Sequence, residues 1–248
     1  MAIGNPAEPS IALHSKDARH SKDALRNGAL NSVTFTETRF LHPIPVKQIS
    51  YARAKRLLDI ALAGAGIIVL SPIFFIVALM VRLTSRGEVI FKQTRVGEGG
   101  RLFTCYKFRS MHVGAEQNKC KLEHLNEVSG PVFKIKNDPR VTLVGRFIRK
   151  LSLDELPQLW NVLRGEMTVV GPRPPVPREV ALYNDRELGR LAVPPGLTCL
   201  WQINGRSNIA FEHWVELDLL YIETMSLRGD LQIIARTIPA VLFCRGAH

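Results

Sequence analysis

The chain has 248 residues, 46% of them hydrophobic, which is enough for one sizeable buried core. Lysine and arginine number 33 against 22 aspartates and glutamates, and the net charge of +11 suits either a nucleic acid or an anionic membrane surface. The four cysteines lie far apart, without Cys-x-x-Cys or mixed Cys/His spacing, which argues against a structural zinc site and a disulfide framework.

Residues 1–48 are polar and mixed in composition. They hold one short tandem repeat, in which His14-Ser15-Lys16-Asp17-Ala18 is followed by His20-Ser21-Lys22-Asp23-Ala24. Two copies of five residues are too few for a repeat fold. The first ten residues also lack the apolar core of a secretory signal, so we expect none. We predict a disordered N-terminal arm that ends at residue 48.

The most apolar stretch of the chain runs from residue 57 to residue 83, and as a helix it is about long enough to cross one bilayer. Pro72 lies at its centre, where a proline removes a helix hydrogen bond, and basic residues flank both ends. Because Lys- and Arg-rich flanks stay on the cytoplasmic side, a helix that enters, bends at Ser71-Pro72 and returns satisfies both observations. We predict a re-entrant membrane helix over residues 49–86. A straight spanning helix with a mild kink is the alternative.

We predict that residues 87–248 form a small domain of the α+β class that is mostly helical. Alternating strands over 89–91 and 102–106, joined through glycines, indicate a short β-hairpin. The polar stretch 112–130 is interpreted as a helix.

The remaining elements of this domain are helical. Apolar spacing predicts helices over 144–151 and 156–163, and a polar helix precedes the proline turn at 194–196. The tail, residues 227–243, is amphipathic and suits a helix in the membrane interface, although packing in the core explains it equally well.

Asp154 and Glu155 form an acidic pair with two interpretations. Ser-x-x-Glu is a capping box, in which Ser152 and Glu155 satisfy each other's amides and Asp154 is an ordinary first-turn acid. Pro157 favours a helix that starts later, which leaves both acids on less constrained backbone. Adjacent carboxylates that face one pocket need a cation, and a Mg²⁺ ion bound with substrate phosphates would supply it.

Several basic residues suit a multiply anionic ligand. Arg173 lies between two prolines, so its phosphate-binding fork is presented on restricted backbone. Lys107, Arg149 and Arg206 add cations, each of which would alone be an ordinary surface charge. Together with the acidic pair they indicate phosphoryl chemistry, which depends on charge neutralisation. A G-x-x-x-x-G-K-[ST] loop is absent, so ATP chemistry has little support.

From Lys55 onward the chain resembles the bacterial sugar transferase family, the monotopic polyprenyl-phosphate phosphoglycosyl transferases, in its small, exopolysaccharide-type form. The motifs that carry the resemblance are Lys55-Arg56-Leu57-Leu58-Asp59, Ser71-Pro72, Lys107-Phe108-Arg109-Ser110-Met111, Asn137-Asp138-Pro139-Arg140-Val141-Thr142, the continuous stretch 145–174, Pro195-Gly196-Leu197-Thr198 and Trp201-Gln202-Ile203-Asn204-Gly205-Arg206-Ser207. Cys199 departs from the pattern, since the family usually has a small residue there.

The resemblance implies a reaction and a set of site residues. Asp154 would attack the sugar-bearing phosphate of a UDP-sugar, Glu155 would hold Mg²⁺, and undecaprenyl phosphate would accept the sugar phosphate from the aspartyl intermediate. Three further positions match family residues that handle phosphates: Lys107, Arg149 and Arg173. Asp218 matches a further acid that the family has near the site. Ser71-Pro72 matches the position at which the family's re-entrant membrane helix breaks.

The same resemblance sets the expected location and partners. Residues 87–248 would be a catalytic domain with interfacial helices on the cytoplasmic face of the bacterial inner membrane, in contact with membrane lipid. Glucose or galactose is preferred as the sugar, and a homo-oligomer is left open. The rival interpretation is a non-catalytic membrane scaffold that binds anionic lipid or an assembly partner. No groove-binding motif supports a nucleic-acid partner.

Overall fold

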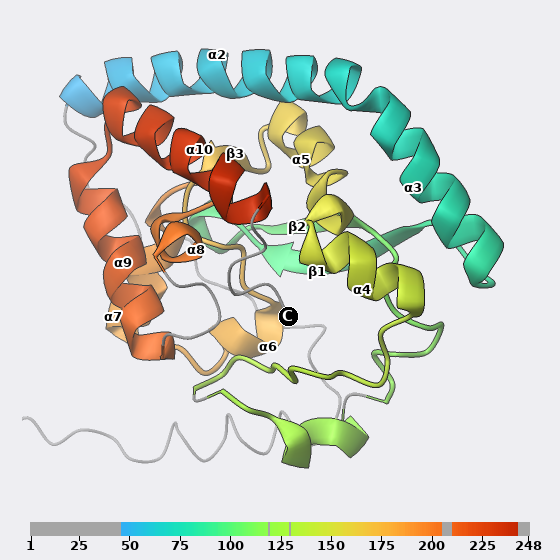
Figure 1. Ribbon diagram of the computed structural model, residues 1–248. Coiled ribbons are helices and arrows are strands. Elements are labelled where there is room, and N and C mark those ends of the chain that lie inside the picture. Colours follow the sequence, from blue (N-terminus) through green and yellow to red (C-terminus); the bar gives the residue numbers. More distant parts are fainter. Residues whose placement is uncertain (1–45, 119, 129, 205–209, 243–248) are drawn as a thin grey trace, which may run out of the picture. The chain divides into compact units, whose positions relative to one another are not determined.

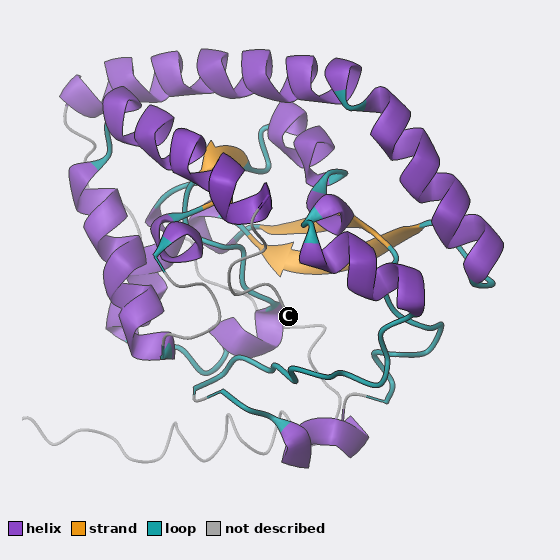
Figure 2. Cartoon of the chain, viewed as in Figure 1, coloured by secondary structure: helices purple, strands orange, loops and turns teal. Residues whose placement is uncertain are grey.

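The computed structural model describes residues 46–118, 120–128, 130–204 and 210–242. All of them belong to one compact unit. Most of these residues are helical, and short strands lie between the helices (Figure 1, Figure 2), which confirms the predicted mostly helical α+β class. Of the predicted arm, residues 1–45 lie outside the described residues, and residues 46–48 already belong to the helix α2.

A bent pair of helices, α2 (Val46–Val69) and α3 (Ser71–Thr84), begins the described chain, with an angle of 62° between them. Pro72 has no backbone N–H, so the carbonyl of Ile68 loses the amide that would follow it by four residues. The hydroxyl of Ser71 donates to that carbonyl over 2.8 Å instead. The helix therefore breaks at Ser71-Pro72, as predicted, and the serine satisfies the acceptor that the proline leaves unpaired.

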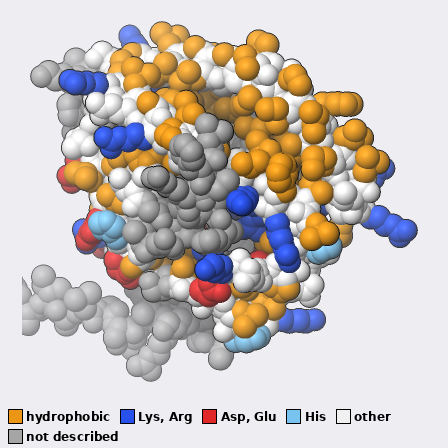
Figure 3. Space-filling model, viewed as in Figure 1, with side chains coloured by type: hydrophobic (Ala, Val, Ile, Leu, Met, Phe, Trp, Pro, Cys, Tyr) orange, Lys and Arg blue, Asp and Glu red, His pale blue; other side chains and the backbone are white. Residues whose placement is uncertain are grey.

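Large apolar side chains cover the outer surface of this helix pair (Figure 3). Those exposed to solvent are Leu57, Ile60, Ile68, Val69, Ile73, Phe75, Ile76, Leu79 and Leu83. Within the described residues, only the bent pair taken together has the length and composition of a membrane-crossing segment, and neither of its helices has them alone. Placement of the pair in a membrane stays a prediction.

The predicted β-hairpin is confirmed, with longer strands. β1 (Ile90–Val96) and β2 (Leu102–Phe108) pair antiparallel, from Ile90 opposite Phe108 to Val96 opposite Leu102. Their turn is a short 3₁₀ helix, η3 (Glu98–Gly100), in which two glycines have the positive φ that glycine adopts readily. Since side chains alternate along a strand, Cys105 and Lys107 share one face of β2.

The helix predicted over 112–130 is wrong. This stretch consists of turns and one 3₁₀ helix, η4 (Cys120–Leu125), among its described residues. Gly114 has a φ of +82°, which interrupts any helix there, and no apolar period offers a face to bury.

Two helices predicted from apolar spacing are confirmed within two residues. They are α4 (Leu143–Lys150) and α5 (Gln158–Arg164), and a short 3₁₀ helix, η5 (Leu153–Glu155), separates them. The side chain of Thr142 accepts the amide of Gly145 over 2.8 Å and caps α4. Gly165 ends α5 in the left-handed conformation.

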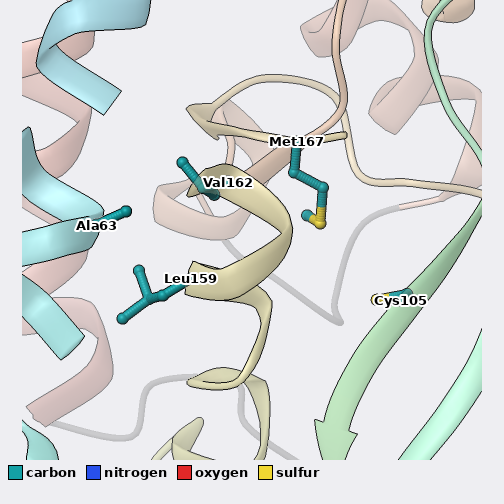
Figure 4. Close-up of a cluster of buried hydrophobic side chains, with 5 residues drawn as sticks. All are labelled: Ala63, Cys105, Leu159, Val162 and Met167. Atoms are coloured by element: carbon teal, nitrogen blue, oxygen red, sulfur yellow. The ribbon is translucent and has the colours of Figure 1, made fainter. Parts of the chain in front are cut away.

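Helix α5 joins α2 to the hairpin. One buried apolar cluster contains Ala63, Cys105, Leu159, Val162 and Met167 (Figure 4). The fully buried Asn161 adds polar contacts to β2, because its side chain accepts from the amide of Tyr106 (3.1 Å) and donates to the carbonyl of Thr104 (2.7 Å). The hairpin face that carries Cys105 and Lys107 is thereby held against α5.

A second, parallel pair of strands was not predicted. It joins β3 (Thr168–Val170) to β4 (Gly196–Thr198). The two backbones approach so closely that a Cβ on Gly196 would lie 2.1 Å from the backbone nitrogen of Gly171. The amide of Gly196 also donates to the carbonyl of Pro172 over 2.8 Å. The two proline-rich turns recognised in the sequence therefore meet here, where only glycine fits.

Helices complete the described chain. Four of them are short: α6 (Pro177–Val180), α7 (Asp185–Leu188), η6 (Gly189–Ala192) and α8 (Leu200–Ile203). Two are longer: α9 (Phe211–Thr224) and α10 (Leu227–Leu242). The predicted tail helix is confirmed as α10, and its Ile233 packs with Val170 and Tyr221 in a buried cluster.

Two buried acids fasten α2 to this body. Asp59 accepts from the hydroxyl of Thr168 (2.7 Å) and from the amide of Val169 (2.9 Å) on β3. Asp230 on α10 accepts from the ammonium of Lys55 over 2.9 Å.

Asp230 also collects two phenols. One oxygen of its carboxylate accepts from Tyr51 as well as Lys55, and the other accepts from Tyr221, each phenol at 2.8 Å. Both oxygens of this buried carboxylate are therefore paired, and the cluster joins α2, α9 and α10.

Candidate active site

The acidic pair lies in η5, and the capping-box interpretation of it is wrong. The side chain of Ser152 makes no capping hydrogen bond, and Glu155 reaches Lys107 instead of the Ser152 amide. Ser152 has a φ of +55°, which no other non-glycine residue in the described ranges shares. Such strain clusters at functional sites. Pro157 caps α5, so both acids precede that helix, as the second interpretation held.

Glu155 lies at the centre of a group of cations. Its Oε1 accepts from Lys107 Nζ at 2.6 Å and lies 3.5 Å from Arg173 Nη1. Lys107 comes from β2 and Arg173 from the loop after β3, so three separate segments converge on one carboxylate. The structure therefore brings together three of the predicted site residues.

The loop that carries Arg173 is tied down on both sides. Pro172 accepts the amide of Gly196 on β4, and Pro174 accepts from Arg95 Nη1 on β1 over 2.7 Å. Arg173 stands between these two anchored residues. Its guanidinium loses little further freedom when it binds an anion.

These side chains border a small cleft with about 250 Å³ of empty space that opens to solvent. The lining residues are Arg95, Cys105, Lys107, Glu155, Gln158, Arg173, Pro174, Gly196, Leu197 and Gln202. Three cations against one carboxylate leave a surplus of positive charge, which suits a ligand with several negative charges.

The two acids have opposite pKa shifts. Burial raises the pKa of Asp154 to about 6, against the nearby charges of Lys107, Arg149 and Arg173, which lower it. Burial also acts to raise the pKa of Glu155, but Lys107 and Arg173 outweigh it and hold that pKa at about 2. Glu155 is thus a permanent anion, whereas Asp154 is a poorly solvated carboxylate that is ionised at neutral pH.

Three predicted site residues are not among those that line the cleft, namely Asp154, which is next to Glu155 in the chain, Arg149 and Asp218. Arg149 projects from α4, and its charge acts on Asp154 from that side. Asp218 on α9 is buried and paired with Arg190, whose Nε and Nη2 lie 2.8 Å and 2.7 Å from one carboxylate oxygen. Asp218 therefore belongs to a buried ion pair among the helices, and Arg149 flanks the acidic pair.

Some cleft residues were not assigned from the sequence, namely Arg95, Cys105, Gln158 and Gln202. Arg95 and Cys105 lie on the hairpin, where only the strand register reveals which face meets α5. Gln158 and Gln202 lie within the motifs that carry the family resemblance, and nothing else in the sequence indicated that they would line the cleft. The predicted cation Arg206 lies outside the described residues.

The two carboxylates fit a magnesium ion that arrives with its ligand. They supply the hard oxygens that Mg²⁺ prefers. In the described part of the chain, no cluster of three His, Cys, Asp or Glu side chains could hold a metal. Mg²⁺ commonly binds through one or two carboxylates and completes its coordination with phosphates and water, so the ion would need a phosphate ligand here.

Comparison with known proteins identifies the family. The Bacterial sugar transferase family matches residues 50–244. Galactosyl transferase CpsE of Streptococcus agalactiae is 46% identical over 199 residues, which are 80% of this chain and 44% of that protein. Exopolysaccharide production protein ExoY of Rhizobium meliloti is 42% identical over 202 residues, 79% of this chain and 88% of that protein.

A third relative, the undecaprenyl-phosphate galactose phosphotransferase of Salmonella typhimurium, is 41% identical over 199 residues, 78% of this chain and 41% of that protein. The chain thus spans less than half of CpsE and of the Salmonella protein, and most of ExoY. With more than three quarters of its length matched, the chain belongs to the bacterial sugar transferase family.

Proposed function

We propose that the chain transfers a sugar 1-phosphate from a UDP-sugar to undecaprenyl phosphate, the step that initiates an exopolysaccharide or a related glycan. The observation that carries the proposal is the pair Asp154 and Glu155 beside a cleft lined by Lys107, Arg95 and Arg173. The names of the relatives support a hexose as the sugar, with galactose or glucose preferred.

In the first half-reaction, a carboxylate oxygen of Asp154 attacks the phosphorus that bears the sugar. A bond forms between this oxygen and phosphorus, the bond to the bridging oxygen breaks, and UMP leaves with that oxygen and its electron pair. The aspartate has become an acyl phosphate that carries the sugar. No proton needs to move, because UMP leaves as an anion.

In the second half-reaction, a phosphate oxygen of undecaprenyl phosphate attacks the same phosphorus. The bond to Asp154 breaks, the carboxylate is restored, and undecaprenyl-diphosphate sugar is formed. Two anionic substrates thus use the same cleft in turn.

The surrounding side chains perform charge neutralisation. Arg173 is presented by its anchored loop and would contact phosphate oxygens in both half-reactions. Lys107 keeps Glu155 ionised, and Arg149 offsets the charge of Asp154 from the other side. Glu155 would hold Mg²⁺ together with the phosphates of the substrate, and the ion when bound would supply charge neutralisation there.

We place the enzyme on the cytoplasmic face of the bacterial inner membrane. Support comes from the exposed apolar surface of α2 and α3 and from basic residues at both ends of the pair. A bent pair that stays on one side would hold the cleft near the bilayer surface, where the phosphate of the lipid carrier lies.

The test uses full-length protein in lipid nanodiscs with Mg²⁺, undecaprenyl phosphate and a panel of UDP-sugars labelled in the sugar. UMP release and label in the lipid phase are measured, beside the Asp154→Asn variant and a sample with EDTA. We expect label in lipid for a UDP-hexose, abolished by the substitution and by EDTA. No turnover with any donor, from protein shown to be folded and inserted, contradicts the proposal.

A further inference from the structure

The cleft contains one polar side chain whose hydrogen-bonding capacity is not used within the described protein. Gln158 is 3% exposed, yet its Nε2 has no hydrogen-bond partner among the described residues. A buried amide donor without a partner costs free energy, and Gln158 is the residue with such a donor that also lines the cleft, where a ligand could accept from it.

The backbone directs this side chain toward the acidic pair. Hydrogen bonds of the 3₁₀ type link Leu156 to Leu153 and Leu159 to Leu156, so residues three apart lie on the same side of the chain here. Gln158 therefore lies on the same side of the chain as Glu155, and both border the cleft.

Each of the charged side chains around Gln158 already has a contact within the protein. Lys107 and Arg173 contact Glu155, and Arg95 donates to Pro174. Gln158 offers a neutral donor at the same place. A neutral N–H that is itself buried gives a directed hydrogen bond to an anionic oxygen without adding to the charge balance.

We propose that Gln158 Nε2 donates to a non-bridging oxygen of the phosphoryl group that is transferred, and so positions it for attack. The inference rests on the proposed function and adds a binding residue to it. Because the transferred phosphoryl group is present in both half-reactions, Gln158 contributes to both. A residue that contacts the uridine portion would affect only the release of UMP.

The experiment measures the two half-reactions separately on full-length protein in nanodiscs. UMP release from the UDP-hexose without lipid acceptor reports the first, and transfer to undecaprenyl phosphate from the isolated intermediate reports the second. The variants are Gln158→Met, which has a similar size and no donor, and Gln158→Glu, which replaces the donor by an anionic oxygen. Gln117→Met serves as the matched control, because Gln117 lies on an exposed turn and does not line the cleft.

We expect Gln158→Met to slow both half-reactions by about 10- to 100-fold, the loss of one hydrogen bond to a charged group. We expect its melting temperature to be unchanged or higher, because the unpaired donor is gone. Gln158→Glu slows both at least as much, and Gln117→Met matches the wild type.

Three results overturn the inference while wild-type turnover and the inactivity of Asp154→Asn uphold the proposed function. They are a wild-type rate in either Gln158 variant, a defect confined to UMP release, and a rate loss matched by a fall in melting temperature. An inactive wild type overturns both proposals.

Discussion

Two clusters of acidic and basic side chains in this protein have similar contacts, but only one of them borders the cleft. At Asp230, one carboxylate receives three donors, from Lys55, Tyr51 and Tyr221, and its side chain is 1% exposed. At Glu155, the carboxylate shares Lys107 and Arg173, its side chain is 17% exposed, and a cleft opens beside it.

The two clusters differ in the charge that is left over after their acidic and basic side chains have paired. Both oxygens of Asp230 are satisfied by side chains of the protein, so the cluster has no capacity left for a ligand. Around Glu155 the cations exceed the carboxylates that line the cleft, and the neighbouring Asp154 has a raised pKa. A buried ion pair alone does not mark a functional site, whereas surplus charge beside open space does.

The largest expected effect is that of Asp154→Asn. The amide cannot form the acyl phosphate, so UMP release falls by roughly 1,000-fold or more. The melting temperature does not fall, because the variant no longer buries a charge. Retention of activity in a folded variant would contradict the claim that the cluster at Asp154 and Glu155 is the functional one.

Asp230→Asn tests the other cluster and should give the opposite result. Removing the charge leaves Lys55 buried without its partner, and the free energy of unfolding falls by about 3–5 kcal/mol. Activity per folded molecule stays within a few-fold of the wild type, since the cluster does not border the cleft. Denaturant unfolding in parallel with the transfer assay measures both. A folded, stable but inactive variant would contradict the comparison.

Lys107→Met should act on rate more than on stability. We expect a loss of about 100-fold in UMP release, as for removal of one donor in a preorganised site. Glu155 keeps Arg173 and the open cleft, so unfolding changes far less than in Asp230→Asn. A large drop in melting temperature with little change in rate would show that Lys107 is structural, like Lys55.

The smallest effect is expected for Asp59→Asn. This acid receives only neutral donors, from Thr168 and Val169, and the variant keeps one carbonyl oxygen for the amide of Val169. The hydroxyl of Thr168 can rotate and accept from the new amide. We expect a loss of about 1 kcal/mol in unfolding free energy and an unchanged rate.

Local patterns predicted the parts of the fold that depend on neighbouring residues. The hairpin, α4, α5, α10 and the break at Ser71-Pro72 follow from side-chain period and from the missing N–H of a proline. The pair β3 and β4 did not, because three-residue strands show no period and their pairing depends on two glycines far apart in sequence.

The candidate site divides in the same way. Asp154 and Glu155 were visible, but spacing alone favoured a capping box, and the left-handed Ser152 that excludes it has no sequence signal. The convergence of Lys107 and Arg173 on Glu155 depends on tertiary contacts. For the same reason, nothing in the sequence indicated that Asp230 would have more hydrogen-bond donors around it than Glu155.

The most direct test of the central claim is the mass of the protein after exposure to its UDP-hexose with Mg²⁺ and without lipid acceptor. The account predicts an added hexose phosphate, on the peptide that contains Asp154, which disappears when undecaprenyl phosphate is supplied and is absent from Asp154→Asn. Turnover without any such adduct, or an adduct on another residue, would contradict Asp154 as the nucleophile.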